Sequence, residues 1–329
     1  MKLHLFLLPL LLVPLASAVA APAPAFATSA EDVIQKDDDP KLRERKKLFE
    51  DCVGRELPAA WSEYIHVMCD HSGYKWKKKK IESEELAKEV VLFSHALFVE
   101  YCELMDVKPV KAFEFRQEIL LFEDVKDHAK VGREVLEWTI PEESEDMPMR
   151  RGGAPGGYTI HLNSTFAKDG AALRKRLTQN LVSAFLDAQK PISVLITSGN
   201  AWLTVGLGMW FEDKHYQTVS ASDNSELAEA LPAKAKKWRG AIKKLVKKKK
   251  LGKFEDLIQL SGNDMDSDAA LMAASLVDFL IQKDIKAFRE LVLHIKSKTP
   301  TRDAVQVVYG WKLDELEDAW SAWVVKKYK

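Results

Sequence analysis

The chain has few cysteines, no excess of charge of either sign and, after its first residues, no long apolar run. Three cysteines in 329 residues exclude a dense disulfide scaffold. The 49 basic and 49 acidic side chains give a formal net charge of zero, which argues against a protein that binds nucleic acid or membranes with its whole surface. An apolar fraction of 47% is ordinary for a globular protein. Any specific chemistry must therefore be sought in local patterns.

Complete catalytic and cofactor-binding motifs are also missing. No Gly-x-Ser-x-Gly nucleophile elbow, phosphate-binding P-loop or dinucleotide glycine fingerprint occurs. Cys52, Cys69 and Cys102 allow three disulfide pairings with one thiol left over, or all three are small buried hydrophobic residues. His66 and His71 would point to opposite faces of a strand because their separation is odd, so this histidine-bearing segment predicts no metal site.

The first 21 residues have the order of a secretory signal peptide. A lysine at position 2 precedes an apolar run over residues 5–15, and three small residues follow it. The run contains two prolines and is too short for a comfortable membrane span. We expect cleavage near Ala18 or Ala21, then a flexible tail over residues 22–38. This predicts a secreted or periplasmic protein with no transmembrane segment in the mature chain.

Hydrophobic spacing predicts strands only in the first half of the chain. The expected strands cover 62–69, 113–122 and 158–162, and the expected helices between them cover 39–55, 83–105, 124–131 and 170–189. From residue 201 onward the pattern is almost wholly helical. This order predicts an α+β fold over residues 39–329. A small strand-bearing lobe, about 39–190, packs on a mainly helical lobe, about 191–329.

The most informative residue patterns lie in two successive segments that are predicted to be helical. The first contains Gln179-Asn180-Leu181-Val182-Ser183-Ala184-Phe185-Leu186, and the second opens with Trp202-Leu203-Thr204-Val205-Gly206-Leu207-Gly208. The order and the residue types of these two motifs resemble those of the gluzincin-type zinc metallopeptidases, which are peptidase-MA-like and have a thermolysin-like fold. Their signature is a helix with His-Glu-x-x-His and then a helix entered through Trp-Leu-x-Glu-Gly-Leu-Ala. The resemblance covers about residues 40–325 and implies a zincin-like fold.

The resemblance also implies which residues occupy the family's functional positions. Gln179 and Ser183 stand in the places of the two histidines, Asn180 in that of the general base, and Val205 in that of the glutamate ligand. Zinc needs neutral imidazole or anionic ligands, and an amide cannot act as a general base near neutral pH. The resemblance therefore implies a degenerate member with no catalytic residues, no metal ligands and no cofactor, so that zinc is expected to be absent.

We therefore expect an exported pseudo-peptidase that binds a peptide, glycan or protein in the former active cleft between the lobes. The residues expected to line this cleft are Tyr158, His161, Gln179, Asn180, Ser183, Trp202 and Val205. The strand over 158–162 is expected to offer an edge to an extended peptide, as the active relatives do. One alternative is an active hydrolase that uses other residues, such as His161 or His215 with nearby acids.

A second alternative depends on the basic segment over residues 233–253, which holds eleven Lys and Arg residues and no acid. Ala235, Trp238, Ile242 and Leu245 form one apolar stripe on this expected helix. In the functional interpretation, a cell-envelope protein docks on an anionic surface, without a specific nucleic-acid partner. In the structural interpretation, the stripe packs on the body and the lysines are solvated. The cations expected to contact such a surface are Lys236, Lys237, Arg239, Lys243, Lys244, Lys247 and Lys248.

Overall fold

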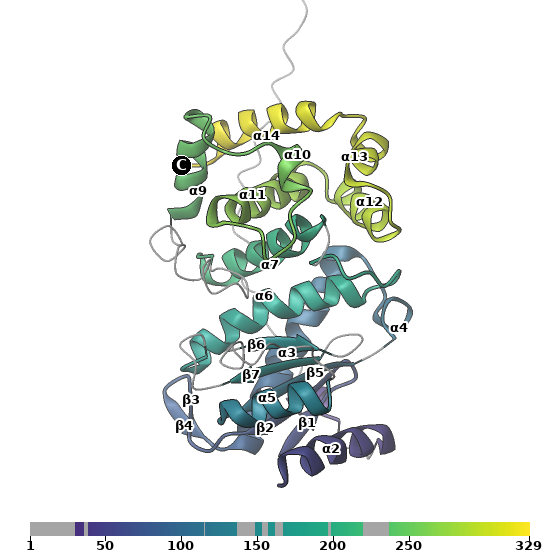
Figure 1. The fold of residues 1–329 in the computed structure, drawn as a ribbon, viewed down its shortest axis with the longest axis vertical. Coiled ribbons are helices and arrows are strands. Elements are labelled where there is room, and N and C mark those ends of the chain that lie inside the picture. The colour runs from purple at the N-terminus through teal and green to yellow at the C-terminus, as the bar shows by residue number, and fades with distance from the viewer. Residues whose placement is uncertain are drawn as a thin grey trace, which may run out of the picture.

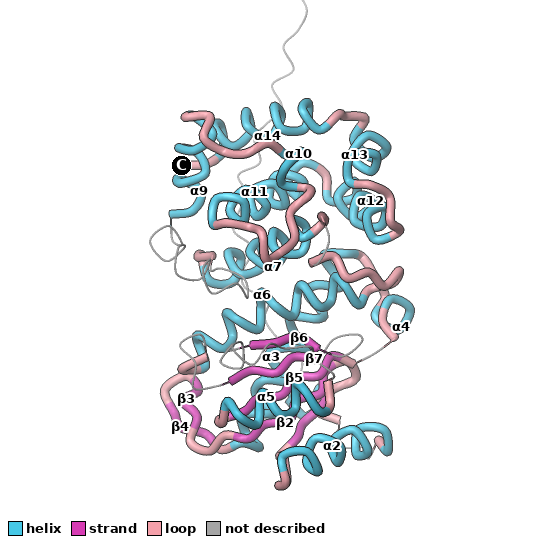
Figure 2. The backbone as a smooth tube through the Cα atoms, viewed as in Figure 1, coloured by secondary structure: helices cyan, strands magenta, loops and turns pink. Residues whose placement is uncertain are grey.

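The computed structural model describes residues 30–35, 39–114, 116–136, 149–152, 157–161, 167–196, 199–219 and 237–329. Within them the protein is a mixed α+β fold: the strands lie between residues 59 and 161, and only helices follow (Figures 1 and 2). The expected signal peptide and most of the expected tail lie outside these residues, and so does Lys236. Among the described residues, no helix has both the length and the apolar character that a membrane span requires.

A five-stranded sheet forms the centre of the strand-bearing lobe. Its order is β1 (Ala59–Trp61), β2 (Ile65–Asp70), β5 (Gln117–Phe122), β7 (Gly157–His161) and β6 (Met149–Gly152). The three central strands are parallel, and β1 and β6 run antiparallel to their neighbours. The separate hairpin of β3 (Tyr74–Trp76) and β4 (Lys79–Ile81) occupies a lysine-rich stretch in which the sequence predicted only a loop.

The expectation that residues 158–162 offer a sheet edge is wrong. Strand β7 is hydrogen-bonded on both sides, to β5 and to β6, so its backbone groups are already paired in the sheet. Among the strands that the structure describes, the edge on this side is β6, which lies in a stretch rich in Glu, Pro and Gly where the sequence predicted no strand. The composition of this stretch does not indicate a strand, because pairing with β7, rather than local propensity, forms β6.

Helices cover both faces of the sheet. Helices α3 (Ser83–Met105) and α6 (Gly170–Ala188) lie on one side, and α2 (Pro40–Val53) and α5 (Val125–Glu134) lie on the other (Figure 1). Alternation along β2 divides the core, because Val67 and Cys69 belong to the main hydrophobic cluster and Met68 to the smaller cluster under α2 and α5. The short helices α1 (Ala30–Val33) and α4 (Pro109–Ala112) complete this lobe.

The helical lobe begins with α7 and confirms the predicted succession of helices. It contains α7 (Ala201–Tyr216), α9 (Trp238–Lys247), α10 (Phe254–Leu257), α11 (Ser267–Lys283), α12 (Ile285–Lys296), α13 (Thr301–Tyr309) and α14 (Leu313–Lys327). Local caps explain where several of these helices start. For example, Asp266 accepts a hydrogen bond of 2.7 Å from the Ala269 N–H at the start of α11.

The two lobes share one hydrophobic core, in which α7 lies between α6 and α11 (Figure 1). Two glycines allow this close packing. A Cβ on Gly206 would lie 2.6 Å from the carbonyl oxygen of Ala273 in α11, and one on Gly208 would lie 2.8 Å from the carbonyl oxygen of Gln179 in α6. Glycine is therefore required on both sides of α7, because any larger residue would push the helices apart.

The three cysteines are buried and unpaired, as the hydrophobic alternative predicted. They lie on α2, β2 and α3 with exposed fractions of 8% or less, and burial raises the pKa of the Cys102 thiol to about 12. They therefore act as small core residues with little thiolate at neutral pH.

Gly206→Ala should destabilise the protein by about 1–3 kcal/mol, because the clash with Ala273 outweighs the gain of about 1 kcal/mol that alanine brings to a helix interior. Chemical denaturation measures the effect. Gly252→Ala is the control, since nothing lies within 4 Å of a Cβ there, and it should change the free energy of unfolding by less than about 0.5 kcal/mol. Equal effects of the two substitutions would show that α7 does not depend on this close approach.

Candidate functional site

The candidate site lies where α6 and α7 pack against each other. Helix α6 starts at Asp169, whose Oδ1 accepts hydrogen bonds of 3.0 Å from both Ala171 N–H and Ala172 N–H. From Arg176 to Ala188 every residue of α6 is buried, including its polar residues. A helix is buried all round when it has neighbours on every side, and here α3 and α7 provide them.

Two of the predicted positions face α7 one helical turn apart. The Ser183 hydroxyl donates to the carbonyl oxygen of Thr204 across a distance of 3.4 Å. One turn earlier, the Gln179 side chain packs against Gly208, where a Cβ would lie 3.1 Å from Gln179 Cγ. Residues 179 and 183 therefore meet residues 208 and 204 in antiparallel order, with Val205 beside Thr204 on α7. Side chains four residues apart on a helix share a face, as two metal ligands would need to do.

The structure closes this contact to solvent. The exposed fractions are 1% for Gln179 and Trp202, 2% for Val205, 4% for Asn180 and 7% for Ser183. These five side chains lie in the shared core rather than on the wall of an open cleft, so a ligand would have to displace covering residues to reach them. Tyr158 and His161 belong to β7 through their backbone, and their side chains lie outside the described part of the chain.

The contact between α6 and α7 is chemically unsuited to zinc. An amide, a hydroxyl and an isopropyl group supply neither imidazole nor an anionic ligand. In the described ranges, no group of three or more His, Cys, Asp and Glu side chains could hold a metal ion. His66 of β2 and His71, just after this strand, have different neighbours: His66 Nδ1 is 3.9 Å from Glu118 Oε1, whereas His71 Nδ1 is 4.0 Å from Glu123 Oε2.

A charged cluster lies at the C-terminal end of α7. The Nε2–H of His215 donates to Glu100 Oε2 at 2.8 Å, and Lys214 Nζ lies 2.5 Å from Glu100 Oε1. Burial raises the pKa of the Glu100 carboxyl, but the hydrogen bond from His215 and the ion pair with Lys214 outweigh it, so the pKa lies below its ordinary value. Within the described residues, His215 makes a hydrogen bond to this carboxylate and to no hydroxyl or thiol.

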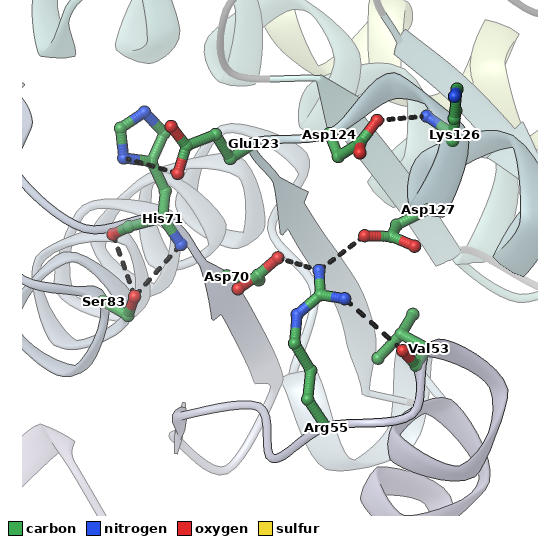
Figure 3. A network of polar contacts seen from close by, with 9 residues as sticks. All are labelled: Val53, Arg55, Asp70, His71, Ser83, Glu123, Asp124, Lys126 and Asp127. Atoms are coloured by element: carbon green, nitrogen blue, oxygen red, sulfur yellow. Dashed lines mark hydrogen bonds and ion pairs between the residues drawn. The ribbon is translucent and has the colours of Figure 1, made fainter.

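A second polar network lies at the carboxyl ends of β2 and β5, an edge where parallel sheets often bind ligands (Figure 3). Here Arg55 pairs with Asp70, at the end of β2, and with Asp127 of α5, whose Oδ2 lies 2.5 Å from the guanidinium. The two carboxylates raise the pKa of Arg55, which therefore stays charged. The network ties the end of α2 to β2 and α5, and the single guanidinium engages both carboxylates while offsetting one of their two negative charges.

Helix α9 is held to the body by two acids that the sequence reasoning missed. Asp213 of α7 accepts hydrogen bonds from the indole of Trp238 at 2.7 Å and from Arg239 at 2.6 Å. Asp278 of α11 lies 3.6 Å from Arg239 and accepts a hydrogen bond of 3.0 Å from the Tyr328 hydroxyl. Asp213 and Asp278 are distant from α9 in sequence, so no local pattern indicates that they contact this helix, and only the fold shows it.

The seven cations predicted for an anionic surface therefore divide into groups. Arg239 pairs with Asp213, and Lys243 donates to the backbone carbonyl of Tyr328 at 2.6 Å, so both help to fasten α9. Lys237, Lys244, Lys247 and Lys248 are exposed, and Lys236 lies outside the described residues. The predicted apolar stripe is confirmed as a packing face at Trp238 and Ile242, which are 2% and 0% exposed.

No protein-family model matches the chain, and a search of curated proteins found no significant match. The gluzincin resemblance therefore depends on the sequence residues quoted for it alone.

Glu100→Gln should lower the free energy of unfolding by about 1–3 kcal/mol at pH 7, because it removes a buried charge-assisted hydrogen bond and an ion pair. The depressed pKa of Glu100 stabilises the fold above the ordinary value of 4.5, and this contribution is lost as the pH falls through the folded-state pKa. Denaturation at pH 7 and pH 3 should thus show a smaller difference between wild type and variant at pH 3. Glu103→Gln, on the exposed side of α3, is the control and should have almost no effect. An effect of Glu100→Gln that does not vary with pH would contradict this account.

Proposed function

We propose that the protein is a non-catalytic, exported member of the gluzincin type, a pseudo-peptidase with a zincin-like fold that binds extended polypeptide. The observation that carries the proposal is the placement of Gln179 and Ser183, which face α7 one helical turn apart. Both lie where a metallopeptidase of this type would direct its two histidines toward the helix that bears the third ligand. The mixed α+β fold, with a parallel central sheet below these helices, agrees with this assignment.

Loss of zinc chemistry follows from the residue types at these positions. Hydrolysis by the usual route needs a metal-bound water and a carboxylate that removes its proton. Asn180 offers an amide in place of the carboxylate, and Val205 offers only an alkyl group in place of a ligand. The alternative hydrolase built on His215 is weaker, because this histidine is paired with Glu100 and Lys214 balances the same carboxylate.

Strand β6 is the element that supports polypeptide binding. It is the last strand of the sheet, so one side of its backbone has no partner strand within the described part of the chain. An extended peptide can add to such an edge through main-chain hydrogen bonds, which need no particular sequence in the peptide. This corrects the earlier expectation for residues 158–162 and moves the docking edge to residues 149–152.

Purified protein should contain far less than about one zinc ion per chain by mass spectrometry, and it should not cleave fluorescent casein in a chelator-sensitive manner. Stoichiometric zinc together with proteolysis that stops on chelation would overturn the proposal.

A restored variant tests the geometry itself. Gln179→His, Asn180→Glu, Ser183→His and Val205→Glu, made together, should yield a protein that binds about one zinc ion per chain. The control carries the first three changes and keeps Val205, and it should bind zinc more weakly. Circular dichroism establishes that each variant is folded. A folded quadruple variant that takes up no zinc would show that these positions do not converge as proposed.

Proline substitutions test the strand edge. Successive residues of an antiparallel strand direct their N–H groups to opposite sides, so only one of Arg150 and Arg151 donates outward from β6. Proline at the outward position should weaken the binding of fluorescein-labelled unfolded casein peptides by about tenfold or more, measured by polarisation, and leave stability unchanged. Proline at the other position should lower stability. Unchanged peptide binding in both variants would exclude β6 as the docking edge.

A further inference from the structure

Helix α9 lies at the outer side of the helical lobe, next to the C-terminal end of the chain (Figure 1). Exposed lysines gather on these two segments. We define the lysine patch as Lys244, the four lysines at 247–250, and Lys326 and Lys327 at the end of α14; all seven are exposed. The two segments are about 80 residues apart in sequence but adjacent in the fold. Lys243 Nζ donates to the Tyr328 carbonyl at 2.6 Å, and a Cβ on Gly240 would lie 3.4 Å from the carbonyl oxygen of Lys329.

Acids in the described part of the chain do not neutralise the patch. Among the described residues, none of its seven ammonium groups forms an ion pair, whereas the neighbouring Lys253 pairs with Glu317 at 3.4 Å. The acids of α14 occupy its first turns, at residues 314–318, and its lysines occupy the opposite end, where they face the helix dipole favourably. Charge is therefore separated along α14, and the positive end joins α9. A chain with zero net charge thus has a strongly cationic region.

The way in which α9 is fastened determines how this region can bind. The apolar face of α9 is already occupied, since Trp238 and Ile242 lie in the core and Asp213 holds both the indole and Arg239. The helix cannot turn this face toward a bilayer without breaking those contacts. Binding must therefore proceed through lysine charges at the surface, without insertion of the helix, and it must be reversed by salt.

We infer that the lysine patch adsorbs the protein electrostatically on an anionic lipid bilayer. The patch consists entirely of lysines, which are mobile point charges, and contains none of the rigid arginine forks that recognise single phosphates by geometry. The patch also extends along the outer side of α9 and the end of α14, so several of its lysines can contact a flat, charged bilayer surface at once. The exposed Val325 lies next to the α14 lysines in sequence, whereas the aromatic side chains of α9 and α14 are buried or packed against the core and offer no open platform for nucleic-acid bases.

Sedimentation of the full chain with vesicles tests this inference. The protein should bind vesicles of phosphatidylcholine with 30% phosphatidylglycerol at 50 mM NaCl, and it should not bind pure phosphatidylcholine. The partition coefficient should fall by at least about tenfold between 50 and 500 mM NaCl. Because insertion of the apolar N-terminal segment would survive high salt, the salt-reversible fraction is the quantity compared between variants.

A four-residue variant, Lys244→Gln, Lys247→Gln, Lys248→Gln and Lys250→Gln, should lower the salt-reversible partition coefficient by at least about tenfold. Lys249 is kept because its backbone φ is +52°. The matched control removes four exposed lysines from the β3–β4 hairpin of the other lobe, at positions 75, 78, 79 and 80, and should bind like the wild type.

Three results would overturn the inference: binding that ignores salt, equal losses in the patch variant and its control, or patch-dependent retention on heparin without binding to anionic vesicles. The last result would assign the patch to a polyanionic glycan. The test is independent of the proposed function, because it involves neither zinc nor the edge of β6.

Discussion

The packing of α7 between α6 and α11 is the contact on which the rest of the structure depends. Gly206 admits the backbone of α11 and Gly208 admits that of α6, so three helices approach more closely than larger side chains would permit. The strand-bearing lobe reaches the helical lobe through this contact, and one continuous hydrophobic core results. Because cores are close-packed, a change at either glycine must be transmitted to both neighbouring helices.

Under the proposed pseudo-peptidase assignment, the same contact explains what would stand in place of a metal site. In a zinc enzyme the facing sides of two such helices would be kept apart by ligands and a metal-bound water. Here the Ser183 hydroxyl is satisfied by the backbone of Thr204, and Gln179 packs over Gly208, so the space is filled by ordinary packing and hydrogen bonding. Burial of a polar group is costly unless it finds a partner, and the buried Ser183 hydroxyl finds one in the backbone of α7. A metal is therefore not needed to hold the two lobes together.

Much of the fold could be predicted from the sequence, because apolar spacing and helix caps, which are local features, determine where most of its helices lie. The boundaries of α3 and α14 follow their apolar spacing, and aspartate caps mark the starts of α6 and α11. Strand β6 escaped prediction because cross-strand pairing creates it in a stretch with poor strand propensity. The β3–β4 hairpin escaped because its two strands have only three residues each, too few for an alternating pattern to be recognised among the lysines. In the candidate site, spacing placed Gln179 and Ser183 on one face of α6. It could not show that this face is buried, because burial depends on helices that come later in the chain.

Charge in this protein is arranged by the fold rather than by overall composition. Asp213 and Asp278 are buried in the helical lobe, and burying a carboxylate requires a compensating partner. Arg239 and Trp238 provide that partner from α9, and in doing so they fix which side of the helix faces inward. The remaining lysines of α9 must then point to solvent, next to the lysine-bearing end of α14. Two buried acids thus orient the most cationic segment of an overall neutral chain, and the exposed charge is a consequence of how the interior is neutralised.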